Sequence, residues 1–268
     1  MKDVRPGLQH QKIKWQYSPR KRVSTGVKGL DDMLGGGLPS GTCILVLGGP
    51  GAGKTIFGIQ FLYTGVVDHE EAGLYVSFDE SPPYLRRNME CFGWNLKRLE
   101  EERKLAILDL SPIRTFPDKI ELGEFKIRKQ DFNLGVLIET IRKKVQEIQP
   151  QRIVVDSLAT LVIQFPREIE RRNTLLELFQ TIMKLGATGL ILNELQTTYH
   201  RREIQVEEFL AHGVIIFHRI EERGKVSKVV QIEKMRGMPH EQQNRPYEID
   251  EKGIKVFPRE SIFALPKQ

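Results

Sequence analysis

The sequence predicts an α/β domain with a mostly parallel sheet flanked by helices and with antiparallel strands toward the C-terminus. Between residues 42 and 194, short apolar runs of strand length alternate with segments of helical spacing, which is typical of a parallel sheet. After residue 207 the apolar runs follow one another closely, which indicates antiparallel strands. The 268 residues hold one large domain of this kind, because no shift in composition marks a split and no internal repeat is visible.

The individual elements follow from apolar spacing and from breaks at glycine and proline. Leu30, Met33 and Leu34 share one face of a helix over residues 28–34, which the glycines at 35–37 and Pro39 end. Further helices are expected from the glycine-rich loop to about residue 67 and over residues 84–91, 96–103, 134–148 and 168–185. Strands are expected over residues 42–47, 74–78, 105–110, 152–155, 188–193, 213–220 and 226–234, and near Tyr247 and Ile254. Residues 111–133 are polar and aperiodic, so we expect an exposed excursion there.

Residues 48–55, Gly-Gly-Pro-Gly-Ala-Gly-Lys-Thr, fit the phosphate-binding pattern G-x-x-x-x-G-K-[ST], with a strand before them and a helix after them. Backbone N–H groups that turn inward onto phosphate oxygens need positive φ angles and close approach, which glycines allow. We expect Lys54 to bind the β- and γ-phosphates and to assist catalysis, and Thr55 to place its hydroxyl on Mg²⁺. An ordinary glycine-rich turn is the alternative. The residues expected to bind nucleotide are Gly49, Pro50, Gly51, Ala52, Gly53, Lys54, Thr55 and Ile56.

Two other expected strands end in carboxylates. Asp156 follows the apolar residues 153–155, and in a phosphate-loop protein such an aspartate holds Mg²⁺ directly or through water. Asp79 and Glu80 follow the strand over residues 74–78, at the edge where an open α/β sheet binds its ligand. A buried strand ending at a helix cap is the alternative for Asp156, and a solvated strand end or helix cap is the alternative for Asp79 and Glu80. We therefore predict Thr55 and Asp156 as the metal residues.

Composition narrows the class of protein. Apolar residues make up 40% of the chain and charged residues 28%, as in globular proteins with an ample core. No apolar run approaches the roughly 18 residues of a membrane span, and the first residues contain no apolar signal segment, so we expect a cytoplasmic protein without a membrane partner. Cys43 and Cys91 form no metal-ligand spacing, and we expect both to be reduced packing residues.

The net charge of +6 belongs to the N-terminus. Residues 1–22 contain seven basic residues and one acidic residue, whereas the rest of the chain has 34 of each. Trp15 and Tyr17 lie among these charges, which suits stacking on a base or docking on a partner. We expect residues 1–22 to form a solvated basic tail, with polyanion binding as the alternative, and residues 259–268 to form a short C-terminal tail.

Over residues 23–258 the sequence resembles the KaiC-like branch of the RecA-type ATPases. The resemblance is carried by residues 25–41, the phosphate loop through Gly65, and residues 77–82, 154–158 and 234–240. It implies a RecA-type twisted, mostly parallel sheet and assembly as a hexameric ring with ATP between subunits.

The resemblance also implies roles for individual residues. Glu80, with Asp79 beside it, is implied to orient or deprotonate the water that attacks the phosphate, which agrees with the need of phosphoryl transfer for a positioned water. Lys234 and Arg236 match residues that reach the γ-phosphate of the neighbouring subunit. His240 either joins that site or is a surface histidine, and a solvated basic strand end is the alternative for the two cations.

We therefore expect a Mg²⁺-dependent ATPase that forms a ring and acts as a nucleotide switch on a protein partner. A DNA-binding RecA relative is one alternative, because residues 197–206 include His200, Arg201 and Arg202, and nucleic acid is a partner that we rank second. An ATP-gated scaffold with little hydrolysis is another. The chain has one domain where the two-domain clock protein has two, so a clock role is not implied. Glu208 and Phe209 stand where that protein's second domain carries a phosphorylated Ser-Thr pair, so autokinase activity is not expected.

Overall fold

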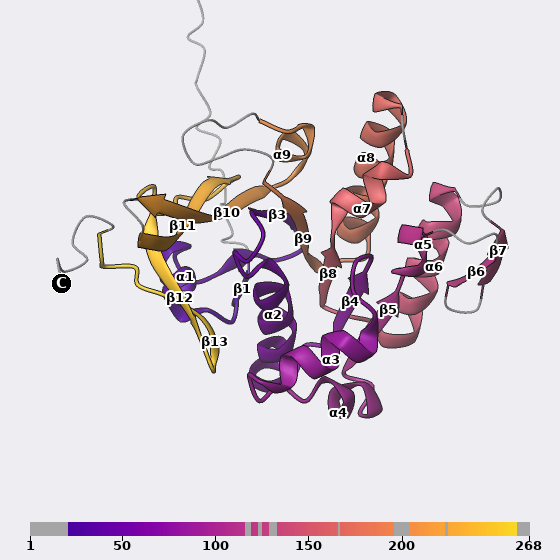
Figure 1. Ribbon diagram of the computed structural model, residues 1–268, viewed down its shortest axis with the longest axis horizontal. Coiled ribbons are helices and arrows are strands. Elements are labelled where there is room, and N and C mark those ends of the chain that lie inside the picture. The colour runs from indigo at the N-terminus through magenta and orange to yellow at the C-terminus, as the bar shows by residue number, and fades with distance from the viewer. Residues whose placement is uncertain are drawn as a thin grey trace, which may run out of the picture.

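The computed structural model describes residues 21–115, 119–122, 125–128, 133–165, 167–195, 204–222 and 225–261 (Figure 1). Residues 1–20 of the expected basic tail, with Trp15 and Tyr17, lie outside the described residues, as does most of the expected C-terminal tail. The cluster of His200, Arg201 and Arg202 also lies outside them.

The main sheet has nine strands in the order β13-β12-β11-β10-β3-β9-β8-β4-β5 within the described residues. Six of them run parallel: β3 (Cys43–Gly48), β4 (Gly73–Ser77), β5 (Leu105–Asp109), β8 (Arg152–Asp156), β9 (Thr188–Glu194) and β10 (Gly213–Glu222). The antiparallel part comprises β11 (Lys225–Met235), β12 (Arg245–Asp250) and β13 (Gly253–Val256), which continue the sheet from β10. The predicted mostly parallel sheet with antiparallel strands toward the C-terminus is therefore confirmed.

Helices cover both faces of this sheet, and the alternation of side chains along β3 shows the two layers. Ile44 and Val46 join a core cluster with α1 (Lys28–Met33), α2 (Lys54–His69), α3 (Pro82–Glu90) and α4 (Leu96–Glu101). Cys43, Leu45 and Leu47 point to the other face, where the covering helices are α6 (Leu134–Ile148), α7 (Leu158–Ile163) and α8 (Glu168–Lys184). A strand with both faces buried reads as a continuous apolar run, as residues 43–47 do.

The register places four strand ends in one row. Gly48 of β3 pairs with Glu194 of β9, and Asp156 of β8 pairs with Ser77 of β4. Because all four strands run parallel, their carboxyl ends lie at the same edge of the sheet, which is where the residues expected to form the site follow.

A buried cation anchors the opposite end of β8. Arg152 is 1% exposed, and its guanidinium pairs with Glu71 at 2.8 Å and donates to the carbonyl oxygens of Ser24 and Phe61. Burial lowers the pKa of Arg152, and the ion pair with Glu71 opposes that shift. The strand that carries Asp156 is therefore tied to α2 and to the start of the domain by charge-assisted hydrogen bonds.

Several short helices and strands were not predicted from the sequence. Residues 111–133, expected as an exposed excursion, contain the helical turn α5 (Pro112–Thr115) and a hairpin of β6 (Lys119–Leu122) and β7 (Phe125–Arg128), which were not predicted. The hairpin lies beyond α6 at one end of the molecule (Figure 1). The strand pair β1 (Arg22–Val23) and β2 (Leu38–Pro39), together with α7 and α9 (Val206–Leu210), was also not predicted, because elements of two to six residues carry little periodicity.

The two cysteines have different surroundings. Cys43 is buried, which raises the pKa of its thiol to about 12, and it packs as expected. Cys91 is exposed at the end of α3, so its assignment as a packing residue is wrong. Among the described residues, no helix combines the length and the apolar character that a membrane crossing requires.

Candidate nucleotide site

The glycine-rich loop curves between the end of β3 and the start of α2 as the motif predicted. Gly51 and Gly53 have φ angles of 72° and 92°, in the left-handed region that favours glycine. A Cβ atom on Gly53 would lie 2.7 Å from Ile249 Cδ1, so a side chain there would collide with β12. The loop backbone therefore has the left-handed conformation that inward-facing N–H groups require, and position 53 has no room for a side chain.

Lys54 is the first residue of α2, and its side chain folds back over the loop. Its ammonium Nζ donates to the carbonyl oxygens of Gly48 at 2.8 Å and Gly49 at 3.3 Å. Burial lowers the pKa of Lys54, and the negative charges of Asp156, Glu194 and Asp79 act in the opposite direction. The charged ammonium thus lies at the loop, in the field of three carboxylates from three neighbouring strand ends.

Thr55 and Asp156, both predicted as metal residues, are in direct contact. The Thr55 hydroxyl donates to Asp156 Oδ2 at 2.7 Å, which joins the start of α2 to the end of β8. The hydroxyl of Tyr75 donates to the same oxygen at 2.5 Å. Asp156 is 8% exposed, and burial raises the pKa of its carboxyl, whereas the two hydroxyl donors lower it.

Glu80 follows β4 and faces an amide. Asn88 of α3 donates from Nδ2 to Glu80 Oε1 at 2.5 Å, and the Ser77 hydroxyl donates to the Glu80 carbonyl oxygen at 2.5 Å. The pKa of Glu80 is raised, chiefly by partial burial and next by the charge of Asp156, while the Asn88 hydrogen bond opposes the rise. A carboxylate with a raised pKa in the field of Asp156 has the chemistry of a group that orients water or accepts its proton.

Asp79 is adjacent in sequence but binds a different element. Ser157 donates to Asp79 Oδ2 at 2.7 Å, and the Thr160 hydroxyl donates to Asp79 Oδ1. Both hydroxyls come from the start of α7. The structure therefore separates the expected pair: Glu80 turns toward α3, and Asp79 ties the end of β4 to α7.

Lys234 and Arg236 lie at the end of β11, and the structure places them against α9. Lys234 Nζ donates to the carbonyl oxygen of Glu208, and an Arg236 nitrogen donates to the carbonyl oxygen of Phe209 at 2.7 Å. Burial lowers the pKa of Lys234, and the neighbouring charge of Arg236 lowers it further. Within the described residues these side-chain contacts join both cations to α9 and not to the phosphate loop of the same chain.

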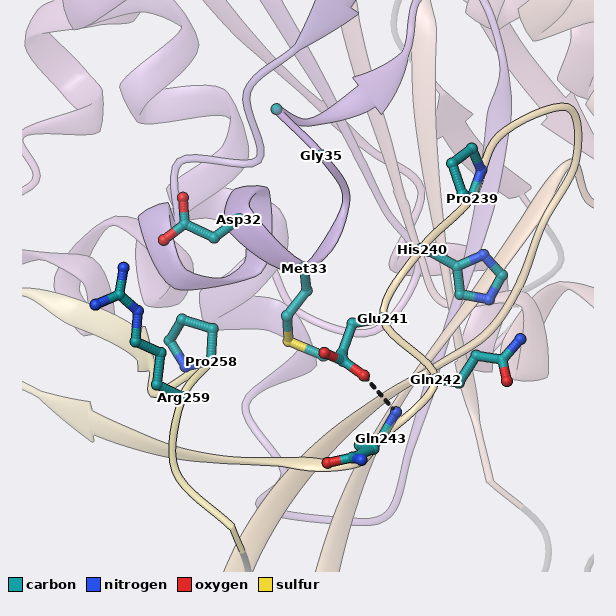
Figure 2. A pocket seen from close by; sticks show the side chains of 11 residues that line it. Asp32, Met33, Gly35, Pro239, His240, Glu241, Gln242, Gln243, Pro258 and Arg259 are labelled. Atoms are coloured by element: carbon teal, nitrogen blue, oxygen red, sulfur yellow. Dashed lines mark hydrogen bonds between the residues drawn. The ribbon is translucent and has the colours of Figure 1, made fainter.

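His240 lines a separate open cavity of about 1050 Å³. Figure 2 shows its ring beside Pro239 on one wall, with Asp32 and Arg259 on the opposite wall. The cavity lies between the segment after β11, the end of α1 and the segment after β13. The structure therefore does not bring His240 into the phosphate loop of its own chain.

The residues present fit a magnesium nucleotide. Mg²⁺ is commonly held by one or two carboxylates together with substrate phosphates, and Asp156 and Thr55 supply oxygen donors next to the loop. Among the described residues, no group of three or more His, Cys, Asp or Glu side chains is placed to hold a metal ion by itself.

Four residues at this edge were not predicted as site residues: Tyr75, Asn88, Glu194 and Tyr247. The Tyr247 hydroxyl donates to the Ala52 carbonyl oxygen at 2.6 Å, so β12 supports the phosphate loop. Glu194 could have been predicted, because it follows the end of a predicted strand as Asp156 does. The other three had no such signal, because each contacts a residue remote in sequence or lies inside a helix with no motif.

The fold and the phosphate loop define the class of protein, a phosphate-loop protein with a RecA-type sheet. A family model described as "ATPase: KaiC" matches residues 23–261. The chain therefore belongs to the KaiC family of ATPases.

Individual relatives agree with this assignment. A UPF0273 protein of Thermotoga maritima is 35% identical over 242 residues, which cover 90% of this chain and 97% of the relative. The circadian clock oscillator protein KaiC of Synechococcus elongatus is 34% identical over 238 residues, which cover 88% of this chain but only 44% of that protein. The crystal structure of a KaiC-like protein from Pyrococcus horikoshii matches with a TM-score of 0.76 and 32% identity, over 90% of this chain and all of that one.

Proposed function

We propose that this protein binds ATP with Mg²⁺ and hydrolyses it, and that it works as a ring-forming nucleotide switch on a protein partner. The observation that carries the proposal is the hydrogen bond between Thr55 and Asp156. It joins the phosphate loop to the end of β8, where a magnesium nucleotide site needs a carboxylate. Membership in the KaiC family of ATPases supports the same reading.

Each residue of the site has a separate role in this proposal. The loop N–H groups and Lys54 hold the phosphates, and Thr55 and Asp156 hold Mg²⁺, which when bound neutralises charge on the phosphate oxygens. Glu80 orients the attacking water and accepts its proton, and the rise of its pKa above the ordinary glutamate value makes it a stronger base. Asp79 keeps the end of β4 fixed against α7 through Ser157 and Thr160.

Assembly completes the site in this proposal. Lys234 and Arg236 lie at the end of β11, and their side chains bind carbonyl oxygens of α9 instead of their own phosphate loop. We infer that they serve the phosphates of a neighbouring subunit in the ring. Phe209, whose carbonyl Arg236 binds, is 64% exposed, which suits a surface covered on assembly. Hydrolysis without autophosphorylation is favoured because neither Glu208 nor Phe209 can accept a phosphate.

The test is ATP hydrolysis by the purified protein across a concentration series, with mass measured in parallel and single-stranded DNA present or absent. We expect turnover that requires Mg²⁺, rises with the hexamer and ignores DNA. Lys54→Ala should lose ATP binding, while Lys97→Ala, at an exposed lysine of α4, should not. Stimulation by DNA would favour the DNA-binding alternative, and ATP that is bound but not hydrolysed would favour the scaffold.

A further inference from the structure

Tyr75 is a fully buried residue of β4 whose hydroxyl has a polar partner at the candidate metal site. The side chain is 1% exposed, and its hydroxyl donates to Asp156 Oδ2 at 2.5 Å. Thr55 donates to that same oxygen at 2.7 Å from the start of α2. One carboxylate oxygen is therefore held by two hydroxyls, one from the phosphate-binding helix and one from the sheet beneath it.

The fold brings these groups together by close packing of α2 on the sheet. Tyr75 pairs with Val154 across β4 and β8, two residues before Asp156. Above them lies Gly58 of α2, where a Cβ atom would be 2.9 Å from Val154 Cγ1 and 3.8 Å from Tyr75 Cε2. Because this position carries no side chain, the helix lies directly on the tyrosine ring, and the Thr55 and Tyr75 hydroxyls meet at Asp156.

The hydrogen bond has a physical task beyond packing. A carboxylate out of water loses hydration, and donors that bind its ionised form compensate for that loss. Tyr75 and Thr55 both donate to Asp156 Oδ2, so this oxygen has two donors in place of water. The apolar ring alone would fill the same volume in a phenylalanine, so the hydroxyl is the part of Tyr75 that acts on Asp156.

We propose that Tyr75 is a positioning residue that holds the Asp156 carboxylate oriented and ready for Mg²⁺, and so sets the Mg²⁺ requirement of the protein. The inference rests on the proposed function, because it assigns a partner to the Mg²⁺-binding residue of that same site. Hydrogen-bond partners of metal-binding carboxylates commonly change metal affinity by about 10- to 100-fold when they are removed.

The test compares Tyr75→Phe with the wild type in two measurements. In Mg²⁺ titrations of ATP hydrolysis, we expect the half-maximal Mg²⁺ concentration to rise by about 10- to 100-fold, with the rate at saturating Mg²⁺ close to that of the wild type. In binding of a fluorescent ATP analogue, we expect the variant to be weaker when Mg²⁺ is present and equal when EDTA is present. The matched control is Tyr63→Phe, which removes the same hydroxyl from a half-buried tyrosine of α2 that stacks on Trp94.

The outcomes test the proposed function and the role of Tyr75 separately. A wild type that neither binds nor hydrolyses Mg²⁺-ATP overturns the proposed function and this inference with it. A wild type that responds to Mg²⁺ while Tyr75→Phe has the same midpoint overturns this inference alone, as does equal weakening of nucleotide binding in EDTA. A third measurement leaves the tyrosine hydroxyl in place and uses 3-fluorotyrosine at position 75 as a probe. Its fluorine NMR resonance should shift when Mg²⁺ is added to the ADP-bound protein. A resonance that does not move contradicts the inference.

Discussion

The Asn88 amide donates to Glu80 Oε1 at 2.5 Å, from a helix that begins just after the strand end carrying Glu80. This contact favours the ionised form of Glu80, whereas partial burial and the charge of Asp156 disfavour it. Asn88 is therefore placed to tune the carboxylate that the proposed mechanism uses as its base.

The first prediction concerns pH. In the proposed mechanism turnover requires ionised Glu80, so it should fall as pH decreases through a pKa that lies above the ordinary glutamate value. Asn88→Ala removes a donor to the carboxylate, which raises that pKa further and moves the acid limb of the kcat profile to higher pH. The control is Gln146→Ala, an exposed amide on α6. An acid limb that stays in place or moves to lower pH in Asn88→Ala contradicts the assigned contact.

The second prediction concerns Glu80 itself. Glu80→Gln keeps the size of the side chain and removes its ability to accept a proton. We expect ATP binding to persist and kcat to fall by about 10²- to 10⁴-fold, the usual contribution of a general base. Nucleotide affinity and single-turnover hydrolysis measured on the same preparation check this, and unchanged turnover would remove Glu80 from the mechanism.

The third prediction concerns support of the phosphate loop by β12. Tyr247 is 2% exposed, and its hydroxyl donates to the Ala52 carbonyl oxygen. Tyr247→Phe leaves that oxygen without this donor, so we expect KM for ATP to rise by about 2- to 10-fold, equivalent to a hydrogen bond of about 0.5–1.5 kcal/mol. A steady-state comparison with Tyr63→Phe should show the rise in KM with little change in kcat, and a loss of kcat at constant KM would count against a role in holding the loop.

The parts of the molecule that the sequence predicted well are those with local signals. Helix α6 was expected over the residues it occupies, because its apolar face is regular and Asn133 caps its start by accepting from the Val136 N–H. The turn after β3 and the strand that ends at Asp156 lie where they were predicted, because glycines and strand ends leave a pattern in a short window. The hairpin of β6 and β7 was overlooked although Ile120, Leu122, Phe125 and Ile127 alternate with charged residues, because two four-residue strands offer few repeats.

The contacts between remote residues could not be read from the sequence. Tyr75 and Asp156 are 81 positions apart and meet only because β4 and β8 are neighbours in this register. The family resemblance likewise implied a role for Lys234 and Arg236 but not that both bind carbonyl oxygens of α9. Such partners depend on strand order and helix placement, which a single sequence does not encode in any one segment.

The fourth prediction concerns stability. Asp156 is buried with a raised pKa, so its ionised form costs the folded state free energy, and stability from this group decreases as pH rises from the ordinary aspartate pKa through the raised one. Asp156→Asn removes the buried charge and keeps an oxygen that accepts from Tyr75 and Thr55. We expect the free energy of unfolding near pH 7 to increase by about 1 kcal/mol, with loss of the Mg²⁺ dependence of nucleotide binding. Urea unfolding without nucleotide checks this, and a destabilised variant contradicts it.

The fifth prediction tests the site between subunits. If Arg236 serves a neighbour, Arg236→Ala should lower kcat by about 10³-fold or more, the lower bound for a cation supplied in trans. A ring of Arg236→Ala and Glu80→Gln subunits contains interfaces where an intact Glu80 of the first variant faces an intact Arg236 of the second. Mixing the two inactive proteins should therefore restore part of the activity, with a maximum at an intermediate ratio. Mixing each variant with Lys54→Ala shows whether recovery needs an intact phosphate loop and an intact Glu80 in the same subunit. The mixture of Arg236→Ala with Lys54→Ala should recover activity, because Arg236→Ala subunits have both. The mixture of Glu80→Gln with Lys54→Ala should stay inactive, because neither subunit has both. No recovery at any ratio, in rings whose mixed composition is verified by native mass spectrometry, would place Arg236 outside the catalytic site.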